Sequence, residues 1–127
     1  MNITEFAEQI VFGKTIEQKL ASPGRLSIDS NRQQRKPLGR VIVPGRPYGL
    51  EMRTGPKGNT PPPHDNTLEN ETERGKLLHF LANHELLATE LMALVLLKFP
   101  DAPHAFRQGV LVTLQEEQAH TQMYIDR

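Results

Sequence analysis

Two glutamates and a histidine in the C-terminal half of the sequence have the chemistry and spacing of metal ligands. Glu117 and His120 are three residues apart, so on a helix their side chains share one face. Glu85 lies at the centre of an apolar stripe when its neighbours are placed on a helical wheel. A carboxylate there is unfavourable unless it is paired or bound to a metal. Carboxylate and imidazole ligands together suit iron or manganese.

Two long helices are predicted to carry these residues. Asn70 and Glu73 form a capping pattern that predicts a helix from about residue 71 to Phe99, where the following proline ends it. A second helix is predicted from about residue 102 to the C-terminus, with Asp101 as its N-cap and Pro103 in its first turn. Because the connection is short, the two helices should be antiparallel neighbours.

Depth along this hairpin selects which glutamate meets the Glu-x-x-His pair. At 1.5 Å per residue, Glu85 and Glu117 both lie roughly 21 to 22 Å from the turn, whereas Glu90 lies only roughly 14 Å from it. We therefore expect Glu85 to meet Glu117 and His120 on an inward face shared with Phe106, Thr113 and Tyr124. Two-metal carboxylate bundles combine a Glu from one helix with Glu-x-x-His from its neighbour.

The neighbouring polar residues have simpler interpretations. Glu116 is expected to be a solvated neighbour, and His84 points about 100° away from Glu85, which places it outside direct ligation. The pair His84-Glu85 does not begin a zinc-protease motif, because Ala88 stands where the second histidine would be. Glu90 faces another apolar side of the first helix. We expect the N-terminal arm, a second subunit or further chain to cover that side.

The N-terminal part, residues 1–66, is predicted to be a separate region from the hairpin at 67–127. Capping patterns at Asn2 and Thr15 predict two short helices, the first ending at Gly13 and the second before Ser22-Pro23-Gly24. The proline-rich stretch that follows predicts an extended arm, with one short strand at most, at Val41-Ile42-Val43.

Composition narrows the class of protein. The sequence has no cysteine, which excludes disulfides and thiolate chemistry, and its longest apolar run, Leu91 to Leu97, is far shorter than a membrane span. We expect a soluble, cytoplasmic protein that makes no membrane contact. Residues 14–57 hold ten Lys/Arg against three acids, a net charge of +7. RNA binding by this basic arm is a third, weaker hypothesis, because no aromatic platform accompanies the charge.

Nearly the whole sequence resembles a family of ferritin-like proteins, the one catalogued as domain of unknown function 455. The stretches that carry the resemblance are Phe6-Ala7 through Lys19-Leu20, Pro44-Gly45-Arg46-Pro47, His84 through Leu91, Phe99-Pro100-Asp101-Ala102-Pro103 with Phe106-Arg107, and Glu116-Glu117-Gln118-Ala119-His120. The resemblance implies an all-α fold of ferritin-like type, with Glu85, Glu117 and His120 at metal-ligand positions. It also implies that Glu90 is a recurrent glutamate, and that the protein is similar to tRNA-hydroxylating di-iron proteins.

The sequence holds only half of such a ligand set. Family members normally continue with two further helices that supply another Glu and another Glu-x-x-His, whereas this sequence has one Glu-x-x-His. The leading hypothesis is a two-metal Fe or Mn carboxylate protein of oxidoreductase type, completed by a second chain in a homodimer or by further sequence. The alternative is a helical scaffold or interaction module without a working metal site, in which Glu85 is protonated or paired with a basic residue of the arm.

Overall fold

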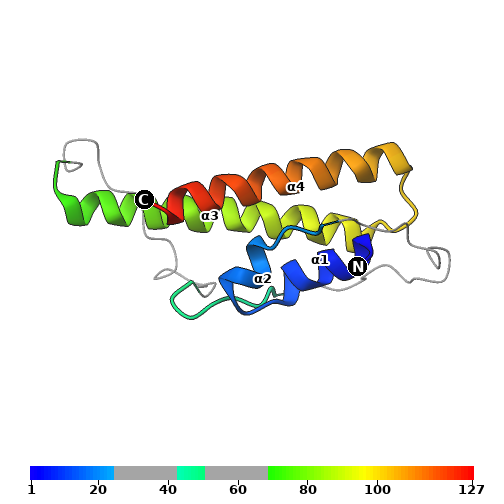
Figure 1. Cartoon of the computed structure of the whole chain (residues 1–127), viewed down its shortest axis with the longest axis horizontal. Helices are drawn as coiled ribbons and strands as arrows, with labels where there is room; N and C mark the ends of the chain where they lie inside the picture. Colours follow the sequence, from blue (N-terminus) through cyan, green and yellow to red (C-terminus); the bar gives the residue numbers. More distant parts are fainter. Residues whose placement is uncertain (25–42, 51–68) are drawn as a thin grey trace.

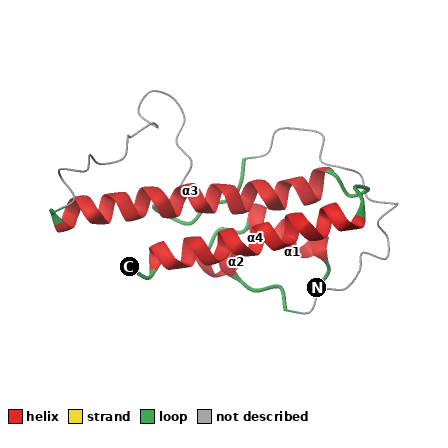
Figure 2. Cartoon of the chain, turned by 90° about the horizontal axis from the view of Figure 1, so that it is seen from above, coloured by secondary structure: helices red, strands yellow, loops and turns green. Residues whose placement is uncertain are grey.

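The computed structural model describes residues 1–24, 43–50 and 69–127 (Figure 1). These ranges contain four helices and no β-strand: α1 (Ile3–Phe12), α2 (Ile16–Leu20), α3 (Glu71–Lys98) and α4 (His104–Ile125). Helices α3 and α4 form a long antiparallel hairpin, with α1 and α2 packed beside it (Figures 1 and 2). The predicted fold class, an all-α protein built on a helical hairpin, is confirmed. Most of the predicted arm and strand lies outside the described residues.

The predicted capping residues start three of the helices. The side chain of Asn2 accepts a hydrogen bond from the Glu5 amide at 2.8 Å, and Thr15 forms a complete capping box with Gln18. Asn70 caps α3 as expected, although its side chain accepts from the amide of Thr72 at 2.8 Å rather than from that of Glu73.

The prediction that Asp101 caps α4 is wrong. The helix begins at His104, and its N-cap is Pro103, which makes no side-chain cap. Ala102 lies in a turn, where its amide donates to the Phe99 carbonyl at 3.2 Å. Helical geometry is also unfavourable for Ala102, because it directly precedes a proline. The Arg107 guanidinium closes the turn, because its Nη1 donates to the carbonyls of Leu96 and Phe99 at 2.9 Å each.

One hydrophobic core joins α1 to the hairpin. Its buried members come from α1, α3 and α4: Ile3, Phe6, Ala7, Ile10, Val11, Ala93, Leu96, Leu97, Leu111 and Leu114. The N-terminal segment therefore covers the second apolar side of α3, the side of Glu90. This was one of three expectations for that side, the others being a second subunit and further chain. By length and composition alone α3 could cross a membrane, a property that it shares with core helices of soluble proteins.

Candidate metal centre

The structure brings Glu85, Glu117 and His120 together on the hairpin. One ligand atom from each lies within 4.8 Å of the other two. His120 Nδ1 is 3.4 Å from Glu117 Oε2 and 3.8 Å from Glu85 Oε2. The depth argument is confirmed as geometry: Glu85, not Glu90, lies opposite the Glu-x-x-His pair.

The cluster lies on a partly open face of the hairpin, contrary to the prediction that this face points inward. The side chains of Glu85 and Glu117 are 23% and 22% exposed and that of His120 is 50% exposed. Phe106 and Thr113, which were expected beside them in the interior, are exposed. The reason is that α1 and α2 cover a different side of the hairpin, where the described core lies.

A buried threonine follows each of the two glutamates by one helical turn and bonds to its carbonyl. Thr89 Oγ1 donates to the Glu85 carbonyl at 3.0 Å, and Thr121 Oγ1 donates to the Glu117 carbonyl at 2.9 Å. Both threonines are fully buried. Each bond runs back one helical turn, a local contact that slightly bends a helix. The same local contact thus occurs at both ligand-bearing turns. His84 stacks on Phe80 instead of joining the cluster.

The two carboxyl groups of the cluster have opposite pKa shifts because a hydrogen bond joins them. A hydrogen bond with Glu117 raises the pKa of Glu85, and partial burial adds to the rise. The same hydrogen bond lowers the pKa of Glu117, which His120 also favours in its charged form. The pair is therefore suited to hold one proton between two carboxylates, and that proton must leave if both are to act as anionic ligands.

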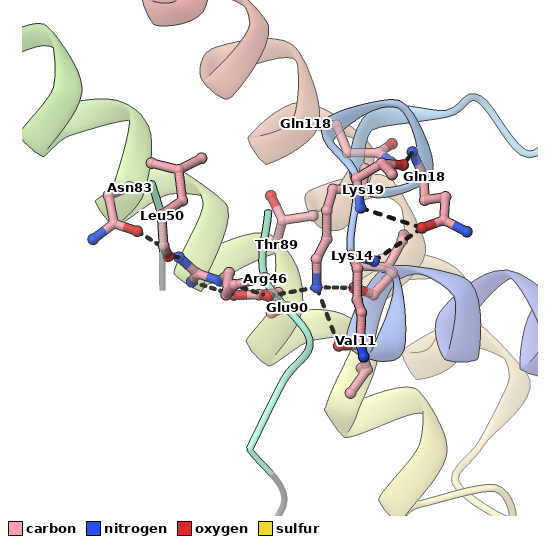
Figure 3. Close-up of polar contacts among 12 residues, drawn as sticks. Val11, Lys14, Gln18, Lys19, Arg46, Leu50, Asn83, Thr89, Glu90 and Gln118 are labelled. Carbon is pink, nitrogen blue, oxygen red and sulfur yellow. Dashed lines mark hydrogen bonds and ion pairs between the residues drawn. The ribbon is translucent and has the colours of Figure 1, made fainter. Parts of the chain in front are cut away.

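Glu90 is the centre of a second polar cluster that the sequence interpretation missed (Figure 3). Lys19 Nζ lies 2.6 Å from Glu90 Oε2, and Arg46 Nε lies 2.9 and 2.8 Å from the two carboxylate oxygens. Arg46 Nη2 forms a further ion pair with Glu90. We call Lys19, Arg46 and Glu90 the buried clamp, because all three side chains are almost completely inaccessible to solvent.

A glycine allows Arg46 to reach the clamp. The Gly45 amide donates to the Val11 carbonyl at 2.9 Å, and a Cβ atom at Gly45 would lie 2.5 Å from the Phe12 carbonyl oxygen. The segment therefore lies against the end of α1 closer than any side chain permits. The Arg46 Nη1 group also donates to the Leu50 carbonyl at 3.1 Å. In the sequence, the motif Pro44-Gly45-Arg46-Pro47 was the feature that could have indicated this contact.

Lys19 is the most deeply buried charge of the clamp. Burial lowers its pKa, whereas the hydrogen bond and charge of Glu90 act in the opposite direction. Its Nζ also donates to the carbonyls of Ile10 and Val11, at the negative end of the α1 dipole. Among the described residues it is thus Glu90, not Glu85, that pairs with basic side chains of the N-terminal segment.

The comparison with protein families gives a match across almost the whole chain. The family described as "Protein of unknown function (DUF455)" matches residues 4–127. The chain belongs to this family. Both the DUF455 hairpin and its N-terminal segment are included in the match, so the cluster and the buried clamp lie within the family region. The comparisons with curated proteins and with solved structures gave no match.

The donor set of this DUF455 chain fits a hard or borderline metal ion. Two carboxylates and one imidazole can bind a divalent transition-metal ion, and the sequence has no thiolate that would favour softer metals. The partial exposure of the three side chains leaves room for additional ligands. Glu116, one residue before Glu117, is exposed, as expected for a solvated neighbour.

Proposed function

We propose that this DUF455 protein is a ferritin-like carboxylate protein that binds iron or manganese through Glu85, Glu117 and His120. The observation that carries the proposal is the convergence of a Glu from α3 and a Glu-x-x-His pair from α4 at one level. Bundles that bind two metal ions use this combination of ligands on neighbouring helices. The bound metal would supply redox chemistry of an oxidoreductase kind, O2 activation or oxidation of the metal itself.

The side chains of the cluster would have distinct roles. His120 would be a terminal ligand through an imidazole nitrogen, since a neutral imidazole binds one ion. Glu85 and Glu117 would hold the metal through their carboxylate groups, because each carboxylate offers two oxygens as ligand atoms. Both glutamates would have to be deprotonated to act as anionic ligands.

A two-metal centre would need more ligands than these three. A second copy of the chain in a homodimer would double the set to two Glu and two Glu-x-x-His, and further sequence of the same chain could provide the equivalent. The open face around the cluster is where either would have to pack.

Metal analysis tests the proposal directly. The protein is purified without chelator, reconstituted with Fe²⁺ or Mn²⁺ under anaerobic conditions, desalted and analysed for metal. We expect bound metal in the wild type, a large loss in His120→Ala and no change in His79→Ala, which removes an exposed histidine of α3. Less than about 0.2 metal ions per chain, with no further loss in His120→Ala, contradicts the proposal.

One observation favours the alternative, a helical scaffold that keeps the fold without a working metal. The hydrogen bond between Glu85 and Glu117 already joins the two carboxyl groups without any ion. In a scaffold, Glu85→Leu would stabilise the fold and abolish no function, because it removes a partly buried carboxyl group. Thermal unfolding of wild type and Glu85→Leu, with and without added Mn²⁺, separates the two hypotheses. If the protein binds metal through the cluster, Mn²⁺ raises the melting temperature of the wild type only.

A further inference from the structure

Lys19 lies at the junction of all four helices (Figure 3). Its ammonium group donates to the Ile10 carbonyl at 2.5 Å, near the end of α1, and to Glu90 on α3 at 2.6 Å. Its own backbone carbonyl, at the end of α2, accepts from Gln118 Nε2 of α4 at 3.0 Å. One buried residue therefore connects the two helices of the hairpin through directional polar contacts.

The contacts of Lys19 reach α3 and α4 close to the metal cluster. Gln118 directly follows Glu117 and precedes His120 by two residues, and its amide also donates to the Ala21 carbonyl at 3.2 Å. Glu90 is five residues beyond Glu85 on α3. Glu90, Lys19 and Gln118 are buried, whereas the cluster is partly exposed. The polar connection is thus internal: on α4 it begins beside the ligands, and on α3 it ends roughly 7.5 Å along the axis from Glu85.

The register of the hairpin determines whether the cluster exists. A slip of one residue moves a side chain about 1.5 Å along the axis and turns it by about 100°. A metal site requires its ligands to be held within about 0.5 Å. Packed apolar side chains such as Leu86 and Leu114 resist such a slip. Buried polar contacts are the best-attested means of fixing one register between helices.

We propose that Glu90, Lys19 and Gln118 form a register strut that holds Glu85 opposite Glu117 and His120. Lys19 and Gln118 are positioning residues: they touch neither the ligands' carboxylates nor the imidazole, and they act by fixing α3 and α4 relative to each other. The part of this inference that concerns metal affinity rests on the proposed function. The part that concerns register does not.

Cobalt binding tests the effect on the site. Co²⁺ is titrated into wild type, Gln118→Met and Gln115→Met, and its visible absorption is followed. Gln118→Met keeps the length of the side chain and removes the amide, and Gln115→Met makes the same change at an exposed position one turn earlier. We expect about a tenfold loss of Co²⁺ affinity and an altered spectrum in Gln118→Met only, the size of effect that supporting residues of metal sites show. An affinity within about twofold of wild type in Gln118→Met overturns the strut.

A second measurement tests the register without any metal. The sequence has no cysteine, so Glu85→Cys with Glu117→Cys places a unique thiol pair at the cluster. Oxidation by diamide joins the two thiols only where the backbones approach within disulfide range. We expect Gln118→Met to slow this closure several-fold and Gln115→Met to leave it unchanged. Equal rates in all three backgrounds overturn the strut.

The two measurements separate the possible failures. If wild type binds no Co²⁺ but the disulfide closes more slowly in Gln118→Met, the proposed metal function fails and the strut stands. If wild type binds Co²⁺ and neither measurement responds to Gln118→Met, the strut fails and the metal function stands. If Gln118→Met does not fold by circular dichroism, Gln118→Asn, which keeps the amide on a shorter side chain, replaces it under the same criteria.

Discussion

At the scale of single residues, two carboxyl groups determine how the cluster responds to pH. Glu85 holds its proton to a higher pH in the folded chain than in the unfolded chain, so its contribution to stability is present at low pH and is lost as pH rises through its folded pKa. Glu117 has the opposite shift, and its contribution is lost as pH falls through its lowered pKa. The pair therefore contributes most to folding stability near pH 4.5, the ordinary pKa of a glutamate.

A neutral side chain at Glu85 removes this pH dependence. In chelator, we expect Glu85→Gln to melt at a higher temperature than wild type at neutral pH, because the amide keeps the hydrogen bond to Glu117 without the repulsion between two carboxylates. The difference should shrink as pH falls through the raised pKa of Glu85. Melting curves by circular dichroism between pH 4 and 8 measure it, with the exposed Glu116→Gln as the matched control. A difference that does not vary with pH contradicts the shared proton.

At the scale of helices and segments, the sequence predicted where Glu85 lies on the hairpin but not where Glu90 finds its partners. The level at which Glu85 meets Glu117 and His120 followed from a fixed rise per residue and a proline-marked turn, both of which are local properties. The buried clamp could not be predicted in the same way. Its members are separated by 71 residues for Lys19 and 44 for Arg46 from Glu90. Their pairing depends on how α1 docks on α3. The distance of Glu90 from the inter-helix turn predicted only that Glu90 does not lie beside Glu117 and His120.

The clamp should control whether the N-terminal segment stays docked. Glu90→Gln leaves two buried cations without their carboxylate, which is a strongly destabilising change of about 3 to 5 kcal/mol. We expect the loss to appear first in α1, α2 and residues 43–50, as faster amide hydrogen exchange and earlier proteolysis there than in α4. The matched control is Glu73→Gln, whose carboxylate pairs with Lys76 in a surface contact at 3.1 Å. Uniform protection in Glu90→Gln would show that the clamp does not hold the segment.

At the scale of the whole molecule, the two sides of the hairpin are unequal. One side is covered by the N-terminal segment and holds the core, whereas the side with the cluster has exposed Phe99 and Phe106 near the turn. Sequence periodicity predicted that α3 is apolar on more than one side. It could not tell which side the N-terminal segment would cover, because the docking of α1 on α3 depends on contacts between residues far apart in the sequence.

A second copy is the partner that we expect on the open side when metal is bound. Metal ligands from two chains would meet across a two-fold axis, so Mn²⁺ should shift the mass measured by light scattering from 14.4 kDa to twice that value. Thr113→Lys places a charge on the face of α4 that carries the cluster and should keep the chain monomeric, because the charge would be desolvated in the contact. Gln115→Lys, at another exposed position of α4, is the control that should still dimerise. A wild type that binds metal and stays monomeric excludes the second copy as the source of the remaining ligands, and a charge at Thr113 would then leave metal binding unchanged.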